Sequence, residues 1–472
     1  MAMKRYLIIL AAALTALLWS CEKDPVEKTD PVDNTPKDIT LSATSFEAVT
    51  AGGDFSLTVT APSRPKVTGL PDWITLKDGT YSQYKITFGL TVAANPTYEA
   101  RTATLTVTSG SLSKTVSVKQ AAAEKPTPPE PGTGEIKADL VTAGASEPAK
   151  KLYGYLRSLY GQKILSGIMA DVNWNHKEAD KVYAATGKYP AINCYDFIHI
   201  YVPKNNWIDY TDLTPVTEWA SAGGIVSLMW HFNVPKSEAT KPGTDGSGVT
   251  CTPSETSFKA SNVFKDNSWE NKWFYAEMDK VIDVVLQLQQ KGIAAIWRPF
   301  HEGAGNACAK QQASWTKAWF WWGYDGPETY KKLWVEMFDY FASKGVKNLI
   351  WVWTTQNYNG NSSQFNRDSD WYPGDSYVDI VGRDLYGSSA QQNAQEFREI
   401  QQAYPTRMVV LAECGVNVSD GNRAFSSIPD LWSAGAKWGW FMPWYGGSMP
   451  DNAWWQKAIG QQYVLTRDQV KY

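Results

Sequence analysis

Two patterns of apolar residues divide the chain. Over residues 38–121, apolar and polar positions alternate in short runs at 54–60, 84–92, 103–108 and 114–120, separated by Gly, Pro and Asn. Alternation with a period of two and closely spaced turns predicts a small all-β sandwich. From residue 136 to 472, continuous apolar runs alternate with helical patterns instead. Such apolar runs are typical of buried parallel strands.

The second region predicts an α/β fold of the (β/α)8 TIM barrel type. Its strand-like runs are 163–169, 189–197, 224–230, 293–300, 348–353, 378–385, 408–413 and 436–443. Helical patterns lie between most of them, for example at 269–291 and 327–345. Eight strands that alternate with helices fit a closed barrel. A doubly wound open sheet is the alternative, but no glycine-rich phosphate loop follows the first strand.

The first 21 residues are typical of an export signal. Lys4 and Arg5 precede an apolar run, 6–19, that is short for a membrane-spanning helix. The run ends at Leu18-Trp19-Ser20-Cys21, which resembles a bacterial lipobox in which Cys21 is lipidated. An ordinary signal peptide with a chance Cys is the alternative. We therefore expect an outer membrane lipoprotein of a Gram-negative bacterium, displayed on the cell surface or, as a second choice, facing the periplasm.

Two polar segments predict flexible connections. Residues 22–37 are rich in Pro, Asp, Lys and Thr and have no apolar period, so we expect a disordered tether. Residues 122–135 are rich in Pro and predict a semi-rigid linker. The expected organisation is thus signal peptide 1–21, tether 22–37, sandwich 38–121, linker 122–135 and barrel 136–472.

Charge and composition exclude several classes of partner. The formal net charge of -3 gives no electrostatic basis for binding nucleic acid or an anionic membrane. The four His residues lack metal-ligand spacing and the five Cys residues form no CxxC pair, so we expect no metal and no cofactor. Cys194 and Cys414 end apolar runs and predict buried free thiols. Cys251 and Cys308 lie in loop-like sequence, and a disulfide between them stays open.

Two of the strand-like runs end in a carboxylate, Glu302 and Glu413. Active-site residues of a barrel lie at the C-terminal ends of its strands, and glycosidic-bond hydrolysis needs a pair of carboxyl groups. In the order given above, Glu302 ends the fourth strand and Glu413 the seventh, which face each other across the barrel mouth. A nucleophilic carboxylate must stay ionised, and Arg298 and Tyr386 are candidate hydrogen-bond donors for it. The 23 Trp and 24 Tyr residues would suit the flat apolar faces of sugars, and the cluster 319–322 exceeds what one buried face can absorb.

Several motifs occur in the order expected for one enzyme family. Residues 140–465 resemble glycoside hydrolase family 26, a clan-A barrel family dominated by β-mannanases. The matching segments are 163–167, 189–193, 196–197, 223–233, 298–302, 319–323, 372–375, 377–379, 384–386 and the position of Glu413. Residues 38–121 resemble the BACON type of immunoglobulin-like domain at 71–74, at Asn95 with Arg101, and at 116–120. For that domain, a spacer is favoured over a sugar binder.

The family resemblance implies a role for each candidate site residue. It implies Glu302 as the acid/base, Glu413 as the nucleophile, His231 and His301 as residues that contact the sugar or position the carboxylates, Tyr386 as a donor to Glu413, and Trp319 and Trp444 as stacking platforms. Two loops set this chain apart, the long connection 303–318 after the acid/base and the long polar loop 236–267. Such loops border the substrate.

The expected function is that of a monomeric, retaining endo-β-1,4-mannanase. Its partner would be the backbone of mannan, galactomannan or glucomannan, and its one contact with a membrane would be the lipid on Cys21. The same machinery acting on a β-1,3-xylan or a mixed-linkage β-glucan is one alternative. A non-catalytic surface glycan-binding lipoprotein is another, although Glu302 and Glu413 together argue against it. The balance of endo and exo action, the tolerance of galactose branches and the number of subsites stay open.

Overall fold

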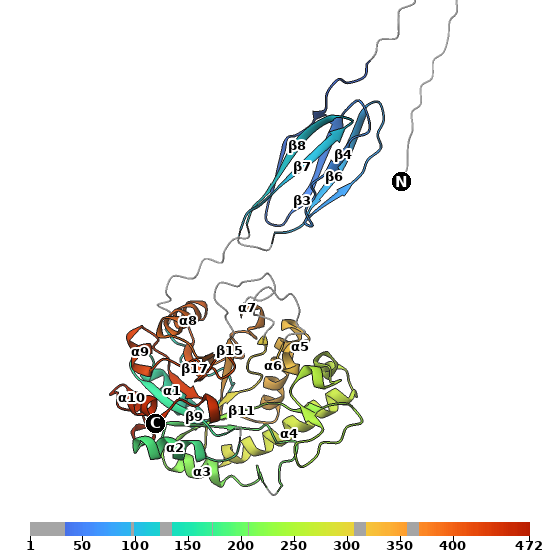
Figure 1. Cartoon of the computed structure of the whole chain (residues 1–472). Helices are drawn as coiled ribbons and strands as arrows, with labels where there is room; N and C mark the ends of the chain where they lie inside the picture. Colours follow the sequence, from blue (N-terminus) through green and yellow to red (C-terminus); the bar gives the residue numbers. More distant parts are fainter. Residues whose placement is uncertain are drawn as a thin grey trace, which may run out of the picture. The chain divides into compact units, whose positions relative to one another are not determined.

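The chain folds into two compact units, Met1–Ala123 and Glu124–Tyr472 (Figure 1). This computed structural model describes residues 34–95, 99–122, 135–171, 173–205, 207–305, 318–355 and 368–472. The predicted signal peptide with Cys21, most of the tether and of the linker, and Cys308 lie outside the described residues. Within them, no helix is long and apolar enough to cross a membrane. Cys194 and Cys414 are buried free thiols, as predicted.

The first unit is the all-β sandwich that the alternating runs predict. One sheet has the strand order β1-β3-β6-β5 and the other β2-β8-β7-β4. The strands are β1 Thr40–Leu41, β2 Ser45–Ala48, β3 Gly53–Thr60, β4 Lys66–Thr68, β5 Ile74–Lys77, β6 Lys85–Val92, β7 Arg101–Ser109 and β8 Leu112–Gln120. Alternate residues of the long strands, such as Leu57 and Val59, face the core between the sheets.

The second unit is a closed parallel barrel, which confirms the predicted fold class. The strand order is β10-β11-β14-β15-β16-β17-β18-β9, and a pairing of β9 with β10 closes the ring. The strands are β9 Ile164–Met169, β10 Ile192–Asp196, β11 Ile225–Met229, β14 Ala295–Arg298, β15 Leu349–Thr355, β16 Ile380–Tyr386, β17 Met408–Gly415 and β18 Trp440–Pro443. Each lies within one of the eight predicted runs or extends it by at most two residues. A short strand, β19 Val464–Leu465, lies along β9, and β12 Val234–Pro235 and β13 Val249–Thr250 form a hairpin after β11.

Helices surround the ring of strands (Figure 1). They are α1 Glu147–Leu159, α2 Lys177–Thr186, α3 Thr214–Ser221, α4 Trp269–Gln290, α5 Trp321–Tyr324, α6 Pro327–Ser343, α7 Asp368–Trp371, α8 Ala390–Ala403, α9 Ile428–Ser433 and α10 Asn452–Ile459. The 3-10 turns are η1 Pro253–Glu255, η2 Ala260–Phe264, η5 Gly446–Ser448 and η6 Arg467–Gln469. Local signals set several starts, because the Ser268 side chain accepts a hydrogen bond from the Asn271 backbone N–H and begins α4. Ser389 begins α8 through a reciprocal capping box with Gln392.

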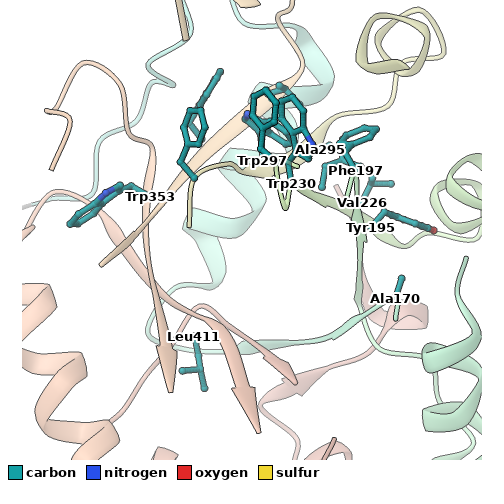
Figure 2. Packing of buried hydrophobic residues seen from close by; sticks show 14 of the residues in the cluster. Ala170, Tyr195, Phe197, Val226, Trp230, Ala295, Trp297, Trp353 and Leu411 are labelled. Carbon is teal, nitrogen blue, oxygen red and sulfur yellow. The ribbon is translucent and has the colours of Figure 1, made fainter. Parts of the chain in front are cut away.

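The core has two layers because side chains alternate along each barrel strand. One face of the strands fills the barrel interior with aliphatic residues such as Ile296, Ile350 and Val410. The other face packs against the helices and carries many of the aromatic residues, among them Trp297 (Figure 2). Large buried side chains fix the ring of strands, and the C-terminal strand ends meet at one mouth.

Candidate active site

Three carboxyl groups meet at the mouth of the barrel. Glu302 follows β14, Asp384 lies near the end of β16 and Glu413 near the end of β17. One carboxylate oxygen from each lies within 4.8 Å of the others. Carboxyl groups that act as acid and nucleophile in a retaining glycosidase stand about 5–5.5 Å apart. The structure therefore brings together the pair, Glu302 and Glu413, that the sequence predicts.

A bulge in β17 places Glu413. The pairing of β16 with β17 is regular up to Arg383 opposite Leu411, and the next pair is Asp384 opposite Glu413. Ala412 is therefore an extra residue in β17, and it packs in the barrel interior immediately before the carboxylate. Bulges of this kind bend a strand and re-aim side chains, often next to active sites.

Glu413 is held by two hydrogen-bond donors. The Tyr386 hydroxyl donates to Oε2 at 2.7 Å, and Nη2 of Arg298 donates to Oε1. Arg298 is buried, and its Nη1 also donates to Asp384 Oδ2 and to Thr354 Oγ1, each at 3.1 Å. Donors on both oxygens stabilise the ionised form of a carboxylate. Arg298 and Tyr386 thus occupy the places that the sequence analysis expects for them.

Glu302 lies in the opposite environment. Burial, followed by the negative charge of Asp384, raises the pKa of Glu302 well above its ordinary value. A hydrogen bond to Asp384 also raises this pKa, because Glu302 must be protonated to donate it. Arg298 and Arg383 act against the shift without overcoming it. These contacts favour the protonated form of Glu302, the form that a general acid requires.

The backbone around Glu302 is strained. Phe300 and Glu302 both have positive φ angles, 45° and 50°, which residues other than glycine rarely adopt. A residue of α6 holds this segment, because the Tyr330 hydroxyl donates to the Phe300 carbonyl at 2.9 Å. Gly303 is tightly enclosed, since an added Cβ atom would lie 2.3 Å from the Tyr330 ring. These contacts hold the acid where the strand ends.

Two histidines lie beside the carboxyl groups as a hydrogen-bonded pair. Nε2 of His301 lies 3.2 Å from Nε2 of His231. His231 is oriented by Asp196, whose Oδ2 lies 2.5 Å from Nδ1 and whose Oδ1 accepts the His231 backbone N–H at 3.0 Å. Burial, Arg298 and His231 lower the pKa of His301 well below its ordinary value, so this imidazole is neutral.

Two functional positions were missed by sequence reasoning. Asp384 and Asp196 both belong to segments that resemble the family, but neither received a role there. Each is an acidic residue at the end of an apolar strand, which is the same signal that identified Glu302 and Glu413. Applying that signal to every strand would have found both.

The aromatic residues of segment 319–322 divide between buried and partly buried positions. Trp321 and Trp322 are fully buried, and their indole N–H groups donate to the carbonyls of Phe232 and His301. One buried face does not absorb the whole cluster, as expected, because Trp319 and Phe320 are only partly buried. Phe320 contacts the active site, with its ring centroid 5.0 Å from that of His301.

The two predicted stacking residues, Trp319 and Trp444, are both partly buried. Trp319 is half-buried next to Gly305, at the return of the loop that follows Glu302. Trp444 is half-buried and its ring centroid lies 5.9 Å from that of His231. Trp444 therefore borders the catalytic centre directly, whereas Phe320, the neighbour of Trp319, makes the ring contact with the histidines.

The carboxyl cluster already has a cationic partner within the chain. Glu302, Asp384 and Glu413 are close enough to ligate a metal ion. However, the guanidinium group of Arg298 is hydrogen-bonded to both Asp384 and Glu413, and Tyr386 takes the second oxygen of Glu413. These donors therefore engage oxygens that a cation would need.

Comparisons with known proteins agree with this geometry. Residues 141–469 match the family model described as glycosyl hydrolase family 26, and residues 66–121 match BACON, a putative N-terminal binding domain. The family 26 domain of an endo-β-mannanase/endo-β-glucanase from Prevotella bryantii is 58% identical, with a TM-score of 0.68, and the match covers 71% of this chain and 100% of that domain. A β-mannanase from a symbiotic protist of the termite Reticulitermes speratus, solved with a gluco-manno-oligosaccharide, is 28% identical with a TM-score of 0.57, over 72% and 99% of the two chains.

Curated proteins with similar sequences carry the name mannan endo-1,4-β-mannosidase. A mannan endo-1,4-β-mannosidase of Thermothelomyces thermophilus is 30% identical over 361 residues, which cover 73% of this chain and 66% of the relative. Two Piromyces mannan endo-1,4-β-mannosidases are matched over 49% and 46% of their lengths, so the chain spans about half to two thirds of these relatives. The family model covers most of the chain, including the barrel and both carboxylate positions. The chain belongs to glycoside hydrolase family 26.

Proposed function

We propose that this protein is a retaining endo-β-1,4-mannanase. The observation that carries the proposal is the pair Glu302 and Glu413, whose carboxyl oxygens lie within 4.8 Å of each other in opposite electrostatic environments. Glu302 is kept protonated by burial and Asp384, whereas Glu413 accepts hydrogen bonds from Arg298 and Tyr386. One group is therefore prepared to donate a proton and the other to attack.

The reaction would proceed by double displacement. In the first step, Glu302 transfers its proton to the glycosidic oxygen while Glu413 attacks the anomeric carbon. The bond to the leaving sugar breaks and an ester forms with Glu413. In the second step, Glu302 removes a proton from water, the water attacks the anomeric carbon and the ester breaks. Glu302 is then protonated again and Glu413 is again ionised, with the original anomeric configuration restored.

The same charges would let Glu302 change role between the steps. Esterification removes the negative charge of Glu413 from a site within 4.8 Å of Glu302. Loss of a neighbouring negative charge lowers the pKa of a carboxyl group. Glu302 would therefore be a stronger acid in the ester intermediate, where it must remain ionised to act as the base. Arg298, which no longer neutralises an ionised Glu413 in that state, would strengthen the effect.

The relatives support a β-mannan as the substrate. The curated proteins are named mannan endo-1,4-β-mannosidases. We propose that the backbone of mannan, galactomannan or glucomannan is cleaved in the cleft beside Trp444, Phe320 and the two histidines. No contact among the described residues favours a β-1,3-xylan or a mixed-linkage β-glucan, and the paired carboxyl groups favour catalysis over glycan binding alone.

Two variants test the assignment of roles. Glu413→Ala should lose activity on all substrates, because it removes the carboxylate that would form the ester. Glu302→Ala should lose activity on mannan but keep activity on an aryl β-mannobioside with a very good leaving group, which departs without a proton. Equal loss on both substrates in both variants would refute the assignment.

Proton NMR of the first product from linear mannan should show retained configuration, and a panel of linear glycans would identify the substrate.

We also propose that Cys21 is lipidated and anchors the chain in the outer membrane, with residues 38–121 acting as a spacer. The proposal is supported by the resemblance of 18–21 to a lipobox and by the match of residues 66–121 to the BACON model. Cys21→Ser should release the protein from the membrane fraction and abolish labelling with a fatty-acid analogue. Membrane association that survives in this variant would refute the anchor.

A further inference from the structure

The loop after β10 carries an exposed tryptophan. Trp207 is 42% exposed, which makes it the most exposed tryptophan in the described part of the chain. Most of the others are buried in the layer between strands and helices. An exposed indole presents a large, flat apolar face with a polar edge, a shape that suits the face of a sugar ring.

Trp207 is held in one orientation. Its indole N–H donates to the Thr244 carbonyl at 2.8 Å, and its backbone N–H donates to Oδ1 of Asn205 at 2.8 Å. The ring also packs edge-on against His199, with the centroids 4.5 Å apart and the planes at 85°. A side chain fixed by such contacts loses little conformational entropy when it binds a ligand.

The two loops that hold Trp207 belong to the catalytic face of the barrel. The first leaves the C-terminal end of β10, and the second leaves the C-terminal end of the neighbouring strand, β11. Asn205 joins them, since its side-chain amide donates to the Thr244 carbonyl at 3.3 Å. Loops at the C-terminal ends of barrel strands build the substrate site in this fold.

A chain of contacts leads from the catalytic centre to Trp207. His231 lies against His301 next to the carboxyl groups and is bonded to Asp196, the last residue of β10. The backbone N–H of His199, three residues further along, donates to the Tyr210 hydroxyl at 3.2 Å, and that hydroxyl donates to the Asp196 carbonyl at 2.8 Å. His199 then contacts Trp207. Trp207 therefore lies at the same end of the barrel as His231 and His301, on the loop that follows β10.

We propose that Trp207 is the stacking platform of a distal subsite that binds a β-1,4-linked mannosyl residue of a long substrate. The proposal rests on the mannanase function proposed above. The C–H face of a pyranose ring is apolar and covers an indole face well, while the sugar hydroxyl groups remain in water. A distal subsite adds affinity only for chains long enough to reach it, so it would make the enzyme prefer polymers and longer oligosaccharides.

The test compares kcat/KM for substrates of two lengths. Trp207→Ala should lower kcat/KM about 10-fold on mannohexaose, the change that about 1.4 kcal/mol of lost stacking produces. It should leave kcat/KM on a short aryl β-mannobioside unchanged, because that substrate ends before the subsite. Trp207→Phe should retain most of the activity on mannohexaose. Tyr183→Ala is the matched control, because Tyr183 is 47% exposed and stacks on Tyr189 rather than on the rim, and it should leave both substrates unaffected.

The outcomes separate this proposal from the one on which it rests. If the wild type hydrolyses mannohexaose and Trp207→Ala matches it at both lengths, the distal subsite is refuted and the mannanase function stands. An equal loss on the short and the long substrate would show that Trp207 only supports the loop, which also refutes the subsite. If the wild type releases no sugar from any mannan, both proposals fail together.

Discussion

Changing Asp384 to Asn should shift the pH dependence of catalysis toward acid. Asp384 raises the pKa of Glu302 through its charge and as a hydrogen-bond acceptor, and their oxygens lie within 4.8 Å of each other. At an effective dielectric constant of about 20, two charges at about 4.8 Å interact by about 3.5 kcal/mol. Arg298, bonded to Asp384, offsets part of this repulsion. We therefore expect the basic limb of the kcat/KM profile on linear mannan to move about 1–2 pH units toward acid.

The direction of this shift follows from the role of Glu302. The acid works while protonated, so activity falls as the pH rises through its pKa, and a lower pKa starts that fall at a lower pH. The assay is kcat/KM against pH for wild type and variant over the range in which both stay folded. Thr354→Val is the control, since it removes a neutral partner of the same guanidinium group and leaves the charges unchanged. An unshifted basic limb in Asp384→Asn, with activity merely reduced, would refute the proposed effect on the Glu302 proton.

Three further changes have defined outcomes. Tyr386→Phe removes the 2.7 Å hydrogen bond to Glu413 and should lower kcat/KM about 10- to 100-fold, since a hydrogen bond to a charged group contributes about 1.5–3 kcal/mol; an unchanged rate would mean that Arg298 alone holds the nucleophile. Gly382→Ala places a Cβ atom 2.8 Å from that of Ala412 and should cost about 1–3 kcal/mol in urea unfolding, with a loss of kcat if the bulge moves; wild-type stability would contradict the crowding. Trp297→Ala empties a fully buried site and should cost about 3–5 kcal/mol by the same measurement.

The fold could be predicted because its signals are local and repeated. Each barrel strand is an apolar run short enough to be a strand, and the helices between them have apolar faces at helical spacing. The run 293–300 contains Arg298 and leads directly into His301 and Glu302, and the structure places all three at the mouth of the barrel. Burying an unpaired charge is costly, so a charged side chain directly after a buried strand lies at the open end of the barrel. For this reason the strand ends could be predicted as site positions.

Features that depend on pairing between strands could not be predicted in the same way. The extra residue in β17 is visible only when β17 is aligned with β16, and nothing in the sequence around Ala412 marks it. The destination of each tryptophan is equally nonlocal, because Trp321 is buried by Phe232 and Phe258, far away in the sequence. Composition showed an excess of aromatic rings but could not divide them between core and cleft.

The identity of the acid follows from the hydrogen-bond connectivity of the site. The oxygens of three carboxyl groups lie within 4.8 Å of one another, beside the guanidinium group of Arg298. Ionising all three would therefore leave a net negative charge in this cluster. Retaining one proton relieves that repulsion. Arg298 is bonded to Asp384 and to Glu413, and Tyr386 adds a second donor to Glu413. Glu302, whose pKa is raised by burial and by Asp384, is the carboxyl group on which the proton is least costly to keep. These contacts support the proposed roles of Glu302 as the proton donor and Glu413 as the nucleophile, and they do so without reference to any relative.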